Sequence, residues 1–333
     1  MKHFPSPETL AVNPAGKKPM TPRPFRQVDV FTSVPYLGNP LAVVLDGSGL
    51  DDAAMQRFAR WTHLSETTFL LPSTQAAADY RVRIFTPGGE LPFAGHPTLG
   101  SCHAWLQAGG QPKDSGMIVQ ECQVGLVNIR RETTTQRLAF AAPPLHRSAP
   151  GADLLAQVVQ ALGLQAGQVL AAQLLDNGPV WLGLLLGSVE SVLQLAPDHL
   201  ALEKLGVKVG IAGIYPPEEV PLLIGRANRE ARAFDIDVRK KPGISAAPGL
   251  EVRAFAAAIG IAEDPVTGSL NASLAQWLMA EDHMPARYLA SQGVCLGHAG
   301  QVHVERDAQG QVWVGGESVT CIEGQVMLGT SLS

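Results

Sequence analysis

The spacing of apolar residues predicts short strands in the first half of the chain. Residues 27–31 and 80–85 place apolar side chains at every second position, a period typical of a strand with one buried face. Residues 42–45 and 67–71 predict two more strands, the first of them buried.

One amphipathic helix is predicted between these strands. Asp51 and Asp52 suit its first turn, because the N-terminal end of a helix carries partial positive charge. Met55, Phe58 and Ala59 follow at the i, i+3, i+4 spacing that lines one buried face.

Three further helices are predicted from apolar stretches that follow turn-forming residues. They cover residues 98–107, a segment from Asp153 to Leu162 with Asp153 as its N-cap, and residues 269–279. Many short strands combined with few helices indicate an α+β fold rather than a regular alternation of strands and helices.

Composition indicates a globular protein of two domains. The chain has 333 residues, of which 46% are hydrophobic and 17% charged, so a packed core is expected. The net charge of −5 and the lack of Lys/Arg runs argue against binding to nucleic acid or to an anionic membrane. The most apolar stretch, residues 180–186, is far shorter than the ~20 residues needed to span a bilayer.

The four cysteines, Cys102, Cys122, Cys295 and Cys321, lie far apart and form no CxxC pair. Neither a zinc ribbon nor a disulfide-rich secreted scaffold is indicated. The N-terminal residues contain no continuous apolar segment of the kind found in signal peptides. A reduced, cytoplasmic location is therefore predicted.

Composition also suggests where the domains begin and end. Residues 1–24, rich in Pro, Lys and small polar residues, predict a flexible tail. The first domain is predicted at residues 25–145, which end just after a Pro-Pro pair, and the second at residues 146–324. We expect a C-terminal strand near residues 325–333 to return to the first domain.

Two segments, one in each half, share four residue types at the same offsets. Gly100–Leu106 reads GSCHAWL and Gly268–Leu274 reads GSLNASL, a similarity that also arises by chance. A true repeat would place one helix N-terminus of each half at the gap between two similar domains. Paired helix N-termini present free N–H groups and partial positive charge, which suits a carboxylate ligand.

Four motifs, in order, resemble those of the PhzF-like family, the phenazine-biosynthesis isomerases that share the diaminopimelate-epimerase fold. They are DVFTSVPYLGNPLAVVLD from Asp29, LSETTF at 64–69, FTPGGELPFAGHPTLG at 85–100 and EDPVTGS at 263–269. The resemblance implies two pseudo-symmetric, barrel-like domains, each a mostly antiparallel sheet around a central helix, with the active site in the cleft between them. It also implies proton transfer without a cofactor, and a homodimer.

Glu66 is the first candidate for catalysis. It lies among Leu64, Phe69, Leu70 and Leu71, and apolar surroundings raise the pKa of a carboxyl towards neutral pH. Such a group can take a proton from carbon and return it elsewhere. From the surrounding residues alone, a solvated loop glutamate is the commoner case. The resemblance reverses this preference, because the Glu of LSETTF is the acid/base of the family.

His96 and Asp264 are the other catalytic candidates. A neutral imidazole at His96, just before the first central helix, can donate to or relay a proton from a bound oxygen. The resemblance places His96 in the pocket and makes Asp264 the partner that orients His96 or the substrate. A structural histidine and a helix-capping aspartate are the alternatives.

Substrate binding is predicted at Gly95, Gly268, Ser269 and Asn39. Glycine permits close approach of the backbone, so its N–H groups and the serine hydroxyl can hold a carboxylate. Asn39, in GNP, matches a substrate-side position of the wider fold. Ordinary turn residues are the alternative at each position. Glu90 is a reserve candidate, as an acid/base or a structural hydrogen-bond acceptor.

Two departures from related families narrow the chemistry. Diaminopimelate epimerases and proline racemases place a cysteine at each helix N-terminus, whereas the corresponding loops here read AGHPT and PVTGS. Cys102 lies inside the predicted first central helix, where we expect an ordinary buried thiol. A mechanism in which one carboxyl moves a proton on one face of the substrate is therefore favoured over a mechanism with two opposed thiols. His298 stands where the PhzF-like family commonly has Arg, which leaves any anion or dimer contact of that arginine open.

No metal and no organic cofactor are predicted, because the histidines form no HExxH set and no P-loop or GxGxxG motif follows a strand. The leading hypothesis is an isomerase or epimerase that moves a proton on a small carboxylated substrate. A non-catalytic small-acid binding protein on the same scaffold is the alternative, and a metal-dependent hydrolase is a minor one.

Overall fold

The computed structural model describes residues 20–114, 116–216 and 247–329. The first half of the chain contains β1 (Thr21–Val30), β2 (Asn39–Val44), α1 (Asp52–Thr62), β3 (Glu66–Leu71), β4 (Tyr80–Phe85), β5 (Glu90–Leu91), α2 (Gly95–Gln107), β6 (Met117–Cys122), β7 (Gly125–Arg131) and β8 (Leu138–Ala141).

The second half contains more strands and short helices. They are β9 (His146–Ser148), α3 (Ala152–Ala161), η1 (Ala166–Gln168), β10 (Val169–Asp176), β11 (Val180–Leu186), α4 (Val189–Leu193), α5 (His199–Leu205), β12 (Val209–Ile214), β13 (Leu250–Ala256), η4 (Ala257–Ile259), β14 (Ile261–Asp264), α6 (Gly268–Ala280), β15 (Arg287–Gln292), η5 (Val294–Leu296), β16 (Gly300–Arg306), β17 (Val312–Gly316) and β18 (Ser318–Leu328).

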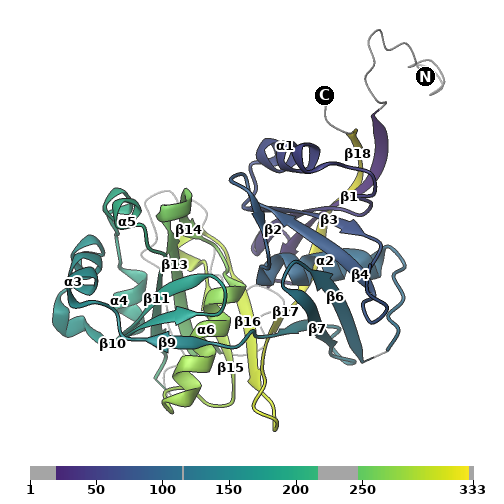
Figure 1. Cartoon of the computed structure of the whole chain (residues 1–333). Helices are drawn as coiled ribbons and strands as arrows, with labels where there is room; N and C mark the ends of the chain where they lie inside the picture. Colours follow the sequence, from purple (N-terminus) through teal and green to yellow (C-terminus); the bar gives the residue numbers. More distant parts are fainter. Residues whose placement is uncertain (1–19, 115, 217–246, 330–333) are drawn as a thin grey trace, which may run out of the picture.

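The two halves repeat one strand topology. In the first, β2 and β3 are parallel and joined through α1, and β4 and β6 are parallel and joined through α2. In the second, β11 and β12 are parallel and joined through α4 and α5, and β13 and β15 are parallel and joined through α6. The remaining pairs are antiparallel in both halves. The expected α+β fold of two pseudo-symmetric halves is confirmed, and Figure 1 shows the halves side by side.

Each half wraps its sheet around one apolar helix. Both α2 and α6 have thirteen residues, and buried residues occur on all sides of each helix, as expected for a helix surrounded by sheet. α2 contacts β1, β2, β3 and β8, and α6 contacts β10, β16 and β17. The main hydrophobic core includes residues of both halves, among them Leu99 of α2 and Trp277 of α6.

The C-terminal strands return to the first half earlier than predicted. β17 pairs with β16 on one side and with β8 on the other, and β18 pairs with β1 over its whole length. The crossing therefore begins at Val312 rather than near residue 325, and it closes the first sheet around α2 (Figure 1). β1 begins at Thr21, so the end of the predicted tail is strand, whereas residues 1–19 lie outside the described residues.

The sequence predicted the start of α1 correctly and misplaced the starts of α2 and α3. Asp51 caps α1, with its side chain accepting a hydrogen bond from the N–H of Ala54. Asp153 is wrong as an N-cap, because α3 is capped by Gly151 and Asp153 lies in its first turn. The central helix predicted from residue 98 begins at Gly95, because His96 and Pro97 take helical conformations in the first turn, where the missing N–H of proline does no harm.

The predicted alignment of Gly100 with Gly268 is wrong, although the halves do repeat. Gly268 is the first residue of α6, and its counterpart in α2 is Gly95. Gly100 lies within α2, where a Cβ atom would come within 2.6 Å of Leu41 and 2.8 Å of Val30. Glycine is therefore needed at Gly100 for packing within the first half and at Gly268 for contact with Gly95. The residue types that the two segments share thus aligned the wrong positions of the two helices.

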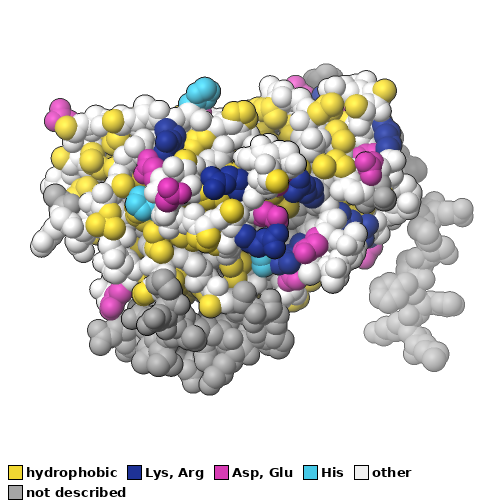
Figure 2. Space-filling view, turned by 90° about the horizontal axis from the view of Figure 1, so that it is seen from below, with side chains coloured by type: hydrophobic (Ala, Val, Ile, Leu, Met, Phe, Trp, Pro, Cys, Tyr) yellow, Lys and Arg dark blue, Asp and Glu magenta, His cyan; other side chains and the backbone are white. Residues whose placement is uncertain are grey.

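Basic and acidic side chains lie close together on the surface. On the face shown in Figure 2, the Lys and Arg side chains near the middle lie among Asp and Glu side chains. Arg130 pairs with Asp307 and Arg287 pairs with Glu305, both at 2.7 Å. The absence of nucleic-acid binding stays a prediction. Of the helices in the described part of the chain, none has the length and apolar character to cross a membrane.

Candidate active site

The N-termini of the two central helices meet. A Cβ atom built on Gly268 would lie 2.9 Å from the Cα of Gly95, and one built on Gly95 would lie 3.0 Å from the Cα of Gly268. Neither helix has a side-chain cap hydrogen bond. Uncapped N–H groups and the positive ends of two helix dipoles therefore converge, which favours an anionic ligand.

Glu66 and His96 form a buried pair at this junction. Glu66 is the first residue of β3, and His96 is the second residue of α2. The Oε2 atom of Glu66 lies 3.3 Å from the Nε2 atom of His96, and the side chains are 13% and 5% exposed. Neither of these two atoms has a hydrogen-bond partner in the protein. Glu66 thus faces the junction, away from bulk solvent.

Burial sets the protonation of this pair. It raises the pKa of Glu66 to about 7, although a hydrogen bond from Ser65 acts in the opposite direction. Burial lowers the pKa of His96 to about 4, against the opposing charge of Asp264. His96 is therefore neutral at physiological pH, and Glu66 is able to exchange a proton there.

Asp264 is held by hydrogen bonds to both of its carboxylate oxygens. The Nδ2 atom of Asn39 donates to one at 2.8 Å, and the hydroxyl of Thr267 donates to the other at 2.7 Å. Asn39 also donates to the carbonyl of Val266 and lies 3.4 Å from Nδ1 of His96. Burial raises the pKa of Asp264 to about 6, partly offset by His96. Asp264 does not cap α6, whose N-cap is Thr267.

Gln292 fixes the direction of these bonds. Its carbonyl accepts from the N–H of Thr267 and from the amide of Asn271, so its own NH2 group must face the Thr267 hydroxyl and the Asp264 carbonyl. The Thr267 hydroxyl receives that bond and points its proton at Asp264. Gln292 and Thr267 were missed in the sequence; the signal for Gln292 was the Gln-Gly pair at the end of β15.

Ser269 is held by the β10–β11 hairpin, which the sequence did not connect with the site. Trp181 donates its indole N–H to the Ser269 hydroxyl at 3.2 Å, and Asn177 donates to the Ser269 carbonyl at 3.0 Å. The signal was the Asn-Gly-Pro turn before β11; in the first half, β2 begins within a Gly-Asn-Pro sequence.

The remaining candidates lie elsewhere or serve the scaffold. Glu90 is exposed on the surface, where it pairs with Arg83 at 2.6 Å. Nδ1 of His298 bonds the carbonyl of Gly38, which joins a loop of the second half to the residue before Asn39. Burial raises the pKa of the Cys102 thiol to about 12. Among the residues that the structure describes, no three His, Cys, Asp or Glu side chains gather as metal ligands would.

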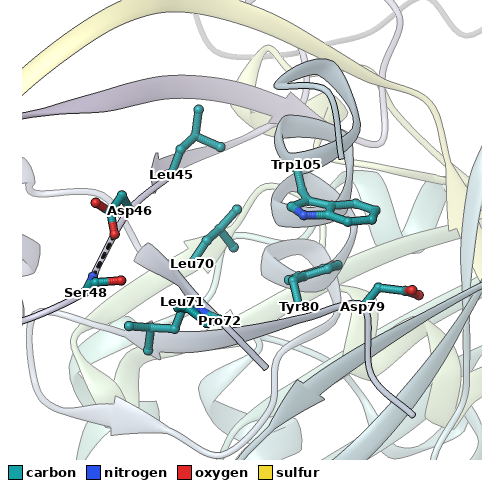
Figure 3. A pocket seen from close by; sticks show the side chains of 9 residues that line it. All are labelled: Leu45, Asp46, Ser48, Leu70, Leu71, Pro72, Asp79, Tyr80 and Trp105. Carbon is teal, nitrogen blue, oxygen red and sulfur yellow. Dashed lines mark hydrogen bonds between the residues drawn. The ribbon is translucent and has the colours of Figure 1, made fainter. Parts of the chain in front are cut away.

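A hollow of about 300 Å³ lies beside Trp105 near the other end of α2 (Figure 3). It contains two carboxylates, but both hold local backbone: Asp46 accepts from the N–H of Ser48, and Asp79 accepts from the N–H groups of Lys113 and Val119. Neither has a free oxygen next to an imidazole, so this hollow lacks the acid/base pair of the helix junction.

Proteins similar to this chain match it over nearly its whole length. The PhzC-PhzF model, described as phenazine biosynthesis-like protein, matches residues 28–324. Antisense-enhancing sequence 1 of Schizosaccharomyces pombe is 32% identical, over 92% of this chain and 99% of its own. The trans-2,3-dihydro-3-hydroxyanthranilate isomerase of Pseudomonas aeruginosa is 33% identical, over 90% and 98%. The crystal structure of a Bacillus anthracis phenazine biosynthesis protein of the PhzF family matches with a TM-score of 0.73 at 21% identity, over 92% and 99%.

These matches cover nearly the whole of both chains, and they extend across both halves of the fold. The protein is an isomerase. It belongs to the PhzC-PhzF family of phenazine biosynthesis-like proteins, which confirms the resemblance drawn from the four motifs.

Proposed function

We propose that the protein moves a proton on a small carboxylated substrate without a cofactor, using Glu66 as general acid/base at the junction of α2 and α6. The observation that carries the proposal is the buried Glu66–His96 pair, whose facing atoms have no protein partner. A carboxyl with a pKa of about 7 is suited both to accept and to return a proton near neutral pH.

The candidate active site has one part that binds the substrate carboxylate and another part that transfers the proton. The uncapped helix N-termini at Gly95 and Gly268, with the Ser269 hydroxyl, hold the substrate carboxylate and stabilise negative charge that develops beside it. Ionised Glu66 takes a proton from an activated carbon, and the electron pair left behind delocalises into the substrate. Protonated Glu66 exchanges its proton with solvent and then returns one proton to another position, so the substrate and product have the same atomic composition.

His96 and Asp264 support this step. Neutral His96 donates to or relays a proton from a substrate oxygen, and Asp264, with Asn39, orients the imidazole or the substrate. The named relative acts on trans-2,3-dihydro-3-hydroxyanthranilate, so a cyclic carboxylate is a suitable first substrate class. A cytoplasmic location and a homodimer belong to the same proposal.

Proton transfer is tested by exchange with solvent. In D₂O, the protein is expected to place deuterium on carbon of at least one member of a panel of small cyclic carboxylates and amino acids, read as a mass shift of one unit per exchanged hydrogen. The Glu66→Gln variant is the matched control, because it keeps the helix tips and lacks the base. If ligands bind and none exchanges, the result contradicts the proposed proton transfer and favours binding alone for these compounds.

The rate of reaction is expected to depend on pH through Glu66. Because the base must be ionised, kcat/KM should rise about tenfold per unit up to pH 7 and level off above it. The slope should steepen below pH 6, where Asp264 also becomes protonated. His96 stays neutral down to about pH 4 and adds nothing to this limb. A profile that is flat between pH 5.5 and 8 would exclude Glu66 as the base.

A further inference from the structure

The indole of Trp181 links the β10–β11 hairpin to the candidate active site. Trp181 is the second residue of β11, and at 3% exposure it is too deeply buried to bind a ligand itself. Its N–H donates to the hydroxyl of Ser269 at 3.2 Å. Ser269 follows Gly268, the residue of α6 that meets Gly95 at the helix junction. A core side chain thus bonds a residue of the part that binds the carboxylate.

Ser269 is accessible where its neighbours are not. It is half-buried, whereas Gly268 and Leu270 on either side of it are buried. A serine in a helix without a fixed partner can rotate and turn its proton to a backbone carbonyl of its own chain. A serine that binds an anion needs a fixed oxygen and a proton that is not already used.

Trp181 supplies both conditions. An indole N–H can only donate, so Oγ of Ser269 must accept in this bond, and the hydroxyl proton is left for another partner. The ring is itself fixed, because it lies in the main hydrophobic core and Lys208 lies over its face, with Nζ 5.0 Å from the ring centroid. The Ser269 oxygen is therefore held by a group that cannot take its proton.

We propose that Trp181 is a positioning residue for the substrate carboxylate and acts through Ser269. The indole N–H fixes the Ser269 oxygen, and the Ser269 hydroxyl donates its proton to a carboxylate oxygen beside the N–H groups of α6. The inference rests on the proposed function only in placing the carboxylate at the N-terminus of α6. It extends the candidate site into β11, whose apolar sequence gave no sign of a polar role.

Two tryptophan variants separate the hydrogen bond from the volume of the side chain. Trp181→Phe removes the N–H and keeps a ring. Trp277→Phe is the matched control, because Trp277 is fully buried in α6 and its N–H has no hydrogen-bond partner among the described residues. In calorimetric titration with 2-aminobenzoate, a stable cyclic carboxylate, Trp181→Phe should bind about tenfold more weakly than wild type, equivalent to 1.4 kcal/mol. Trp277→Phe should stay within about twofold of wild type.

A double variant tests whether Trp181 acts through Ser269. Ser269→Ala removes the hydroxyl and should weaken binding at least as much as Trp181→Phe. Once the hydroxyl is gone, the indole has nothing to position, so the double variant should bind within about twofold of Ser269→Ala alone. A packing role of Trp181 would make the two losses additive.

Circular dichroism and urea denaturation verify that each variant is folded. Trp181→Met also lacks the N–H, adapts to the space of the indole and should show the same loss if Trp181→Phe does not fold. Unchanged affinity in the Trp181 variants, equal losses in the two Phe variants, additive losses in the double variant, or a wild type that does not bind 2-aminobenzoate would each overturn the inference. Because binding is measured without turnover, deuterium exchange can fail while the effect of Trp181 remains, and the reverse.

Discussion

Glu66→Gln is expected to lower kcat by about 10²–10⁴-fold, the usual contribution of a general acid/base. Glutamine keeps the shape of the side chain and the proximity to His96, but it cannot take a proton from carbon. The matched control is Glu90→Gln, because Glu90 lies in the same half but on the surface, paired with Arg83. Glu90→Gln should leave kcat within about twofold of wild type.

Glu66→Gln is also expected to be more stable than the wild type above pH 7. Burial raises the folded-state pKa of Glu66 from 4.5 to about 7, so the folded chain binds more protons than the unfolded chain between these values. The free energy of unfolding of the wild type therefore falls as pH rises through this window, and glutamine has no proton to lose. The difference should be absent below pH 4.5 and reach on the order of 3 kcal/mol above pH 7.

Denaturation in urea at pH 4 and pH 8, together with steady-state kinetics, measures both effects. Loss of turnover with a gain of stability is the signature of a carboxyl kept in an unfavourable environment for its chemistry. A variant with wild-type turnover would remove Glu66 from the mechanism. A variant that loses turnover and also loses stability at pH 8 would make Glu66 a structural residue.

The local sequence pattern predicted the helices and strands of this fold well, but it did not predict how distant strands pair. Asp51 and the stripe at Met55, Phe58 and Ala59 gave α1 correctly, because capping and burial of one face are decided within the helix itself. The return of β17 and β18 to the first half depends on pairing with β8 and β1, and partners so distant in sequence leave no periodic signal. The similarity between the segments at Gly100 and Gly268 gave the wrong alignment, because glycine is required at Gly100 by packing against Leu41, a contact between residues distant in sequence.

The candidate site was predictable where a motif marks it. Glu66, His96, Asn39 and Asp264 come together as a connected cluster, joined by contacts of 2.8–3.4 Å. Their individual roles stay proposals. The polar groups around the cluster were not predictable from local pattern. Gln292 and Asn177 donate to the backbone carbonyls of Asp264 and Ser269, which any residue provides, and Thr267 donates to the carboxylate of Asp264. Only the three-dimensional contacts reveal which of the many polar residues do so.

Gly268→Ala is expected to reduce both stability and turnover strongly. The new Cβ atom would lie 2.9 Å from the Cα of Gly95 and 3.2 Å from the backbone nitrogen of His96, and backbone atoms cannot rotate away as a side-chain end can. The helix tips must separate, which costs about 1–3 kcal/mol in a packed interior. A shift of about 1 Å at a catalytic group lowers the rate about 10²-fold.

Gly89→Ala is the matched control, because Gly89 lies in the same glycine-rich motif as Gly95 and a Cβ atom there would have no neighbour within 4 Å. Its kcat and its midpoint of urea denaturation should stay close to those of the wild type. For Gly268→Ala, turnover measured on the folded fraction should remain low even where the protein is fully folded, since the displaced group is the anion site itself. Normal turnover in that variant would show that catalysis does not depend on the meeting of the two helix N-termini, and the carboxylate would have to bind elsewhere.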